Sequence, residues 1–170
     1  MYRAFTLIEL LTVLSITFIS IYFISPVIYR LQDQIILSSE IENIRSFFYL
    51  IQSKARYTKQ NYSVNIKQDD KSFCIIAIKK IDGLFNKCNC FSINLCDIQS
   101  EYFIYRNISN DILLKSNGLY PKPFLSIDGR SGKLESKCLG LRRNNEGRVL
   151  QFDQNGLINV IQKKKRSKCS

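Results

Sequence analysis

The chain begins Met1-Tyr-Arg-Ala-Phe-Thr-Leu-Ile-Glu-Leu10, which places one carboxylate, Glu9, near the start of a long apolar run. Apart from Glu9, no charged residue occurs between Phe5 and Tyr29. A charge in hydrocarbon costs about 2.5 to 3.5 kcal/mol on insertion scales, so it persists where it has a partner or a task. We therefore expect Glu9 to have a specific role inside a membrane.

The apolar run is long enough to span a bilayer. Residues 5–24 would form a helix of about 30 Å, the thickness of the hydrocarbon core. Its other polar residues are Ser and Thr, whose hydroxyls can bond to helix carbonyls. The run lacks the small-x-small cleavage pattern of a secretory signal peptide, and Arg3 favours a cytoplasmic amino terminus. The sequence thus predicts a single membrane span within residues 5–29.

Residues 1–10 resemble the amino terminus of a type IV prepilin, the class of subunit that builds type IV pili and type II secretion pseudopili. In that family a membrane peptidase cuts before a Phe, and a glutamate four residues later stays in the membrane. The matching residues are Ala4, where most relatives have Gly, Phe5 and Glu9. The resemblance implies a leader of residues 1–4, N-methylation of Phe5, and attraction between Glu9 and the positive amino terminus of a neighbouring subunit.

The helix is expected to continue beyond the bilayer and to cover residues 5–59. Pro26 lies within it, and type IVa pilins are similar in having a proline here that kinks the helix. Beyond Pro26, apolar residues recur at spacings of four and three, which predicts an amphipathic helix with one buried stripe. The stripe is Leu37, Ile41, Ile44, Phe48, Ile51 and Ala55, and the polar residues between them are Ser38, Glu40, Glu42, Asn43 and Arg45.

Residues 60–170 have the pattern of short strands separated by turns. The turns are marked by Gln68-Asp-Asp-Lys71, Asp128-Gly-Arg-Ser-Gly132 and Asp153-Gln-Asn-Gly156, since Asn and Gly tolerate positive φ. A soluble part of about 110 residues buries one core, so we expect an antiparallel sheet packed on the amphipathic half of the helix, an α+β fold. The expected strands are 62–66, 73–79, 91–95, 102–105, 124–127, 149–152 and 157–161.

Two segments near the end of the chain, Ser126-Ile-Asp-Gly-Arg-Ser-Gly132 and residues 147–160, resemble the closing strands of GspH/FimT-like minor pilins. Those proteins end on a hairpin with Gly in the turn and a hydrophobic strand after it. The alternative is that any β-rich pilin domain ends on such a hairpin. The resemblance implies a periplasmic pilin domain over residues 60–170.

The six cysteines of the chain all lie in this β-rich part. The periplasm is oxidising, so an even number of cysteines indicates disulfides, although sequence alone does not determine their pairing. Cys88 and Cys90 are too close in sequence to pair comfortably with each other, so we expect them to have different partners. The preferred pairing joins Cys74 to Cys88 or Cys90, and Cys138 to Cys169. The alternative is a zinc site of Cys88, Cys90 and Cys96, whose spacing lies outside the usual finger patterns.

Positive charge is concentrated in the β-rich part. Residues 63–170 contain 19 Lys and Arg against 10 Asp and Glu, whereas residues 5–62 contain five against four. The simpler interpretation is a solvated surface and tail near an anionic membrane. The alternative is a DNA-contacting patch at a filament tip, serving DNA uptake or adhesion, because clustered cations release counterions from DNA. Its residues would be Arg142, Arg143, Arg148, Lys163, Lys164, Lys165, Arg166 and Lys168.

The sequence contains no recognisable catalytic constellation. It has no histidine, the commonest general base, and no Gly-rich phosphate loop or nucleophile elbow. We expect a structural protein without a cofactor, either a minor type IV pilin or a type II secretion pseudopilin, held in the inner membrane and moving to the pilus or cell surface on assembly. Its expected partners are other pilins, prepilin peptidase and the inner-membrane assembly platform. The remaining alternative is a membrane-anchored periplasmic domain without a filament.

Overall fold

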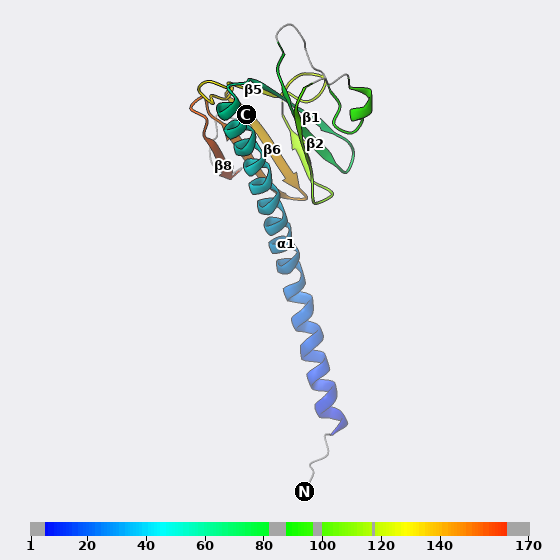
Figure 1. Ribbon diagram of the computed structural model, residues 1–170. Helices are drawn as coiled ribbons and strands as arrows, with labels where there is room; N and C mark the ends of the chain where they lie inside the picture. The colour runs from blue at the N-terminus through cyan, green and yellow to red at the C-terminus, as the bar shows by residue number, and fades with distance from the viewer. Residues whose placement is uncertain (1–5, 82–87, 97–99, 117, 163–170) are drawn as a thin grey trace.

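The structure, a computed structural model, describes residues 6–81, 88–96, 100–116 and 118–162. A long helix, α1 (Leu7–Thr58), carries a β-rich domain on its carboxyl-terminal half (Figure 1). A short 3-10 helix, η1, covers Ile93–Leu95. The strands are β1 Tyr62–Gln68, β2 Phe73–Lys79, β3 Tyr102–Arg106, β4 Leu113–Lys115, β5 Leu125–Ile127, β6 Lys137–Arg143, β7 Glu146–Phe152 and β8 Ile158–Gln162. The predicted α+β architecture is confirmed.

Local chemistry sets both ends of α1. Thr6 is the N-cap, and its hydroxyl accepts a hydrogen bond from the N–H of Glu9 at 3.4 Å, as N-cap residues do. At the other end Lys59 adopts the left-handed conformation with φ 57°. The N–H of Gln60 then donates to the carbonyl of Ala55 at 3.2 Å, which satisfies one of the last helix carbonyls.

The strands form two four-stranded antiparallel sheets, where the sequence led us to expect one. The first sheet has the order β3-β2-β1-β5, and the second has the order β4-β6-β7-β8. The predicted turns at residues 68–71 and 153–156 connect the β1–β2 and β7–β8 hairpins. The two sheets are linked at Gln68 on β1, whose side-chain oxygen accepts a hydrogen bond from the N–H of Leu114 on β4 at 2.6 Å.

The expected strand at residues 91–95 is wrong, because this segment contains a turn and η1. A disulfide joins Cys88 to Cys96 and holds their Cα atoms 5.4 Å apart. A strand rises about 3.3 Å per residue, so an extended segment would separate these atoms by more than about 20 Å. Strands β4 and β6 were not predicted. Gly140 and the two arginines at the end of β6 weaken its strand pattern.

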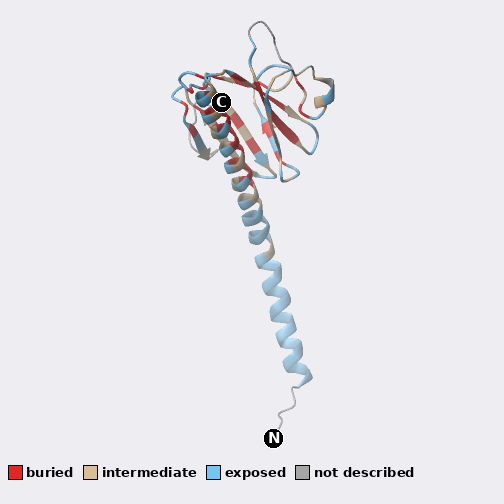
Figure 2. Cartoon of the chain, viewed as in Figure 1, coloured by how far each residue is buried: buried red, intermediate tan, exposed pale blue. Residues whose placement is uncertain are grey.

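The predicted buried stripe of α1 packs between the two sheets. All six of its residues are buried, and Figure 2 shows buried positions on the half of α1 that meets the strands. The ring of Phe48 lies 6.3 Å from that of Phe124, which precedes β5, and 4.6 Å from that of Phe152 on β7. Phe48 therefore contacts both sheets and makes the helix part of one common core.

A second, smaller core lies on β2 and is covered by the cysteine-rich segment. It includes Ile76 and Ile78, together with Cys74, Cys88 and Cys90, all of them almost fully buried. Strand β2 is covered by α1 on one face and by the cysteine-rich segment on the other, so six of the seven residues of β2 are buried.

The cysteines of this smaller core form two disulfides, Cys74–Cys90 and Cys88–Cys96. Of the two partners that the sequence left open for Cys74, the structure therefore has Cys90. The three sulfurs that the zinc alternative requires are all bonded in these disulfides. Cys169 lies outside the described residues, so its bridge to Cys138 stays a prediction.

Candidate functional site

The first half of α1 presents a continuous apolar surface that no other described residue covers (Figure 2). Its large side chains are well exposed, for example Ile8 at 70%, Phe18 at 70% and Tyr22 at 78%. Within the described part of the chain, α1 is the one helix long and apolar enough to cross a membrane by length and composition. These properties are consistent with membrane anchoring.

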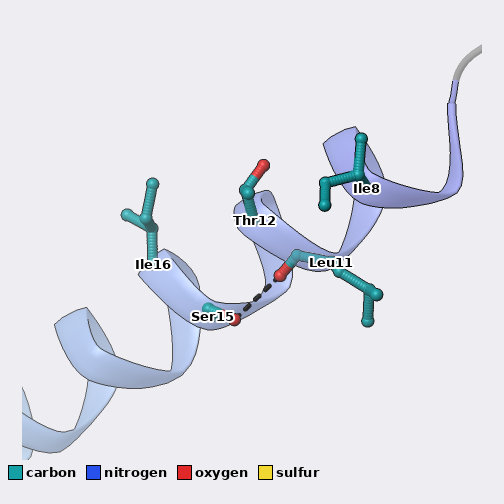
Figure 3. Close-up of a pocket in the computed structure, with 5 residues that line it drawn as sticks. All are labelled: Ile8, Leu11, Thr12, Ser15 and Ile16. Atoms are coloured by element: carbon teal, nitrogen blue, oxygen red, sulfur yellow. Dashed lines mark hydrogen bonds between the residues drawn. The ribbon is translucent and has the colours of Figure 1, made fainter.

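The serine and threonine hydroxyl groups in this half of α1 donate hydrogen bonds to carbonyls of the helix itself. Ser15 donates to the carbonyl of Leu11 at 2.8 Å (Figure 3). Ser20 and Ser25 make the same bond four residues back, at 2.8 and 2.7 Å. A polar group that is already hydrogen-bonded costs little to place in hydrocarbon, so these residues suit a lipid environment or a packed helix bundle.

Glu9 differs from these hydroxyl residues. Its backbone N–H bonds to Thr6, but its carboxylate is exposed and has no hydrogen bond or ion pair with any described residue. A carboxylate on an apolar helix is stable in a low-dielectric setting when a cation neutralises it. Ala4 and Phe5 lie outside the described residues, so peptidase cleavage and N-methylation stay predictions.

Helix α1 continues through Pro26 as one element. Proline has no N–H, so the carbonyl of Tyr22, four residues earlier, loses its usual helical partner. The hydroxyl of Ser25 donates nearby, to the carbonyl of Ile21 at 2.7 Å. The kink predicted at Pro26 stays a prediction.

Asp33 fixes the lower part of the helix to the second sheet. Its carboxylate accepts a hydrogen bond from Nε of Arg143 at 2.9 Å and another from the amide of Asn144 at 2.8 Å. Arg143 also donates to the carbonyl of Asn110 at 3.2 Å. The hydrogen bonds from Asn144 and Arg143 lower the pKa of Asp33. Asp33 therefore joins α1 to the β6–β7 turn and to the loop after β3.

Glu40 makes a second polar contact, two helical turns further along. It is 1% exposed, and its carboxylate accepts hydrogen bonds from the hydroxyl of Tyr105 at 2.7 Å and the N–H of Ile108 at 3.2 Å. Burial, and then the adjacent Glu40, raise the pKa of the Tyr105 phenol well above its usual range, so the phenol stays a donor. The sequence interpretation, which placed Glu40 among the polar residues outside the stripe, is wrong at this position.

A third polar contact closes the upper end of the helix. The side-chain amide of Gln52 donates to the carbonyl of Gly132 at 2.6 Å and to that of Gly156 at 3.1 Å. Both glycines have positive φ, 68° and 83°, a region that favours glycine. A Cβ on Gly132 would overlap the Arg56 side chain, and one on Gly156 would overlap the Gln52 amide. The two segments that resemble GspH/FimT-like proteins thus meet around the end of α1.

The Gly156→Ala variant should unfold more easily than the parent by about 1–3 kcal/mol, because Ala is strained at positive φ and its methyl displaces Gln52. Urea unfolding of the full chain in detergent measures this change. The matched control is Asn155→Ala at an exposed position of the same turn, which should change the free energy of unfolding by less than about 0.5 kcal/mol. Equal stability of the two variants would contradict the close packing described for Gly156.

The Asp33→Ala variant should lose stability in a pH-dependent way. The pKa of Asp33 is lower in the folded chain than the ordinary value of about 3.9. Its stabilising effect is therefore fully present above about pH 4 and is lost as the pH falls through the folded-state pKa. The gap in Tm between parent and variant should be widest near neutral pH and should close in acid. The control Asp70→Ala, at an exposed turn, should give a smaller difference in Tm from the parent at neutral pH. A difference in Tm between the parent and Asp33→Ala that does not change with pH would contradict the contacts described for Asp33.

The structure does not bring the three described arginines of the DNA alternative onto one face. Arg148 lies opposite Leu141, which is buried, and Arg142 lies opposite Gly147. Because cross-strand partners share a face and neighbours alternate, Arg148 and Arg143 are on the inner face of the sheet and Arg142 is on the outer face. Arg143 is also paired with Asp33. The five cations of the tail, residues 163–168, lie outside the described residues.

The role expected for Glu9 stays a prediction, and the three polar anchors Asp33, Glu40 and Gln52 were not predicted from the sequence. A signal for all three was present, and for Gln52 it is its position four residues after Phe48 of the stripe. Asp33 and Glu40 precede Leu37 and Ile44 by four residues each, so they fall on the same helical face as the buried stripe. Polar residues at stripe positions indicate bonds to the domain that covers the stripe. The sequence gives no indication of which groups they bond to.

Comparisons with known proteins agree with this architecture. No protein-family model matches the chain. A Haemophilus influenzae protein, itself uncharacterised, is 26% identical over 173 residues, which cover 100% of both chains. The crystal structure of the type IV minor pilin FimU of Pseudomonas aeruginosa superposes with a TM-score of 0.52 at 15% identity, over 78% of this chain and 93% of FimU. The chain therefore has a pilin-like α+β fold, similar to that of a type IV minor pilin.

Proposed function

We propose that this chain is a minor subunit of a type IV pilus-like filament, held in the inner membrane by the first half of α1, with its β-rich domain in the periplasm. The proposal rests above all on the exposed apolar half of α1, which belongs to a pilin-like fold and carries Glu9, a carboxylate without a partner among the described residues. An isolated membrane anchor has no need of a charge that costs free energy in lipid.

In the mechanism we propose, prepilin peptidase removes residues 1–4 and leaves Phe5 as a positively charged amino terminus, which is then N-methylated. On the assembly platform, Glu9 attracts the amino terminus of a neighbouring subunit. Such an attraction is much stronger in low-dielectric surroundings than in water, and an unpaired charge there is costly. Pairing at Glu9 therefore sets the register in which the apolar helices pack.

Between the two classes of filament subunit, the likeness to FimU favours a minor pilin over a type II secretion pseudopilin. The DNA-binding alternative has less support. Arg143 is paired with Asp33, and Arg142 and Arg148 lie on opposite faces of the sheet. The three described arginines of the DNA alternative thus do not form one face for a phosphate backbone, and we propose the structural role.

Processing tests this proposal. Co-expression with an active prepilin peptidase should shorten the chain by the leader, residues 1–4, so that mass spectrometry finds Phe5 as the first residue. Ala4→Trp should block the cut, because the residue before it must fit a confined site, whereas Ala4→Gly should be cleaved like the parent. An unchanged mass of the parent chain beside a control prepilin that is cut would overturn the proposal.

A further inference from the structure

The β6–β7 turn lies close to the level at which the apolar run of α1 ends. This turn is anchored on Asp33 through Arg143 and Asn144. Asp33 follows Tyr29, the last residue of the uncharged run, by only about 6 Å along the helix. From Leu7 to Asp33 the helix rises about 39 Å, and a bilayer with its headgroups is about 40–45 Å thick. If α1 spans a membrane, the turn lies at the outer headgroups.

The arrangement of the domain supports this placement. Figure 1 shows β6 running toward the amino-terminal half of α1, so its end is among the parts of the domain nearest the apolar segment. Tyr29, about 6 Å before Asp33 along the helix, is 67% exposed. Tyrosines are enriched at membrane–water interfaces, so its position marks the same level. Because Asp33 bonds to Arg143 and Asn144, no long exposed stretch of α1 separates the apolar segment from the β-rich domain.

The turn carries groups that suit lipid phosphates. Arg142 is exposed; its Nε donates to the carbonyl of Asn144 at 2.8 Å, and it makes no ion pair with a described residue. Arg30, also exposed and without a described ion pair, lies three residues before Asp33 on α1, and Asn145 adds an exposed amide. The carboxylate of Asp33 neutralises the charge of Arg143, and that of Glu146 neutralises the charge of one more arginine. The turn and Arg30 together therefore keep a net positive charge of about one.

We propose that residues 142–145, together with Arg30, bind the phosphate groups of anionic lipids, so that the β-rich domain rests on the membrane surface before assembly. This inference depends on the proposed function, because it requires α1 to be inserted. The arginine guanidinium binds phosphate oxygens through paired N–H donors. The outward face of Arg142 makes it the main contact, and Arg143 holds the turn in place through Asp33.

Tryptophan fluorescence can test this inference, because the chain contains no native tryptophan. The full chain is reconstituted in nanodiscs of phosphatidylcholine and phosphatidylglycerol that include a lipid with a nitroxide on its headgroup. Asn145→Trp places the probe in the β6–β7 turn. Asn155→Trp is the matched control, an exposed asparagine in the β7–β8 turn at the other end of β7, about 20 Å away.

The probe at 145 should be quenched at least about twofold more strongly than the probe at 155. Adding Arg142→Gln and Arg30→Gln, or replacing phosphatidylglycerol by phosphatidylcholine, should reduce the quenching at 145, since it weakens the attraction to anionic headgroups. Equal quenching of the probes at 145 and 155 would overturn the inference. So would quenching at 145 that stays the same both after the arginine substitutions and after the replacement of phosphatidylglycerol. A Phe18→Trp probe with nitroxide in the acyl chains separates the two proposals: if it is unquenched, membrane insertion itself fails.

Discussion

Replacing Glu9 with Val should reduce incorporation of this chain into filaments by about tenfold or more, while membrane insertion and cleavage continue. The carboxylate of Glu9 has no partner among the described residues, so in our account its partner is the amino terminus of another subunit. Removing one member of a charge pair in a low-dielectric site typically costs about 3–5 kcal/mol. Insertion should become easier, because the charge is gone.

The measurement compares the amount of variant and parent in sheared filaments with the amount in membranes. Ser15→Ala is the matched control, since it removes a polar group from the same apolar half whose bond is internal to the helix. This control should assemble like the parent. If Glu9→Val enters filaments as efficiently as Ser15→Ala, the role that we assign to Glu9 is wrong.

Replacing Glu40 with Ala should lower the free energy of unfolding by about 2–5 kcal/mol, because it removes a buried carboxylate that accepts hydrogen bonds from two groups. Without this carboxylate, the partly buried hydroxyl of Tyr105 and the N–H of Ile108 lose their acceptor. A buried polar group without a partner pays its full desolvation cost. Thermal and urea unfolding of the full chain in detergent measure the change.

Glu42→Ala serves as the matched control for Glu40, because it removes the same group from an exposed position on the same helix. Glu42 pairs with Arg45 at 3.4 Å on the surface, and such pairs contribute about 0–1 kcal/mol. The Glu40 variant should therefore be clearly less stable than the Glu42 variant. Similar stabilities would show that Glu40 is not the buried acceptor described above.

The helix and its buried stripe could be predicted from the sequence because both depend on local periodicity. A charge-free run of hydrophobic residues and a repeat of four and three leave few alternatives to one long helix. The Gly-containing turns were also predictable, since Gly156 adopts the positive φ that its turn requires. These features need no knowledge of which strands pair.

The division into two sheets and the polar anchors could not be predicted, because they depend on contacts between distant segments. Leu114 bonds to Gln68 across the sheets, and Ile108 bonds to Glu40 on the helix. Neither contact has a local sequence signature. The 91–95 segment was misassigned for the same reason: its apolar residues fit a strand, but the Cys88–Cys96 disulfide closes the segment into a compact loop.

The central claim, that this chain is a processed subunit of a filament, is tested most directly by the mass of the protein recovered from sheared filaments. The chain is expressed at its natural level in cells that assemble type IV pili, and the filament fraction is analysed by mass spectrometry. We expect that the chain is present there, begins at Phe5 and carries one methyl group on its amino terminus. Its absence from the fraction while it accumulates in membranes, or its presence with Met1 retained, would contradict the account.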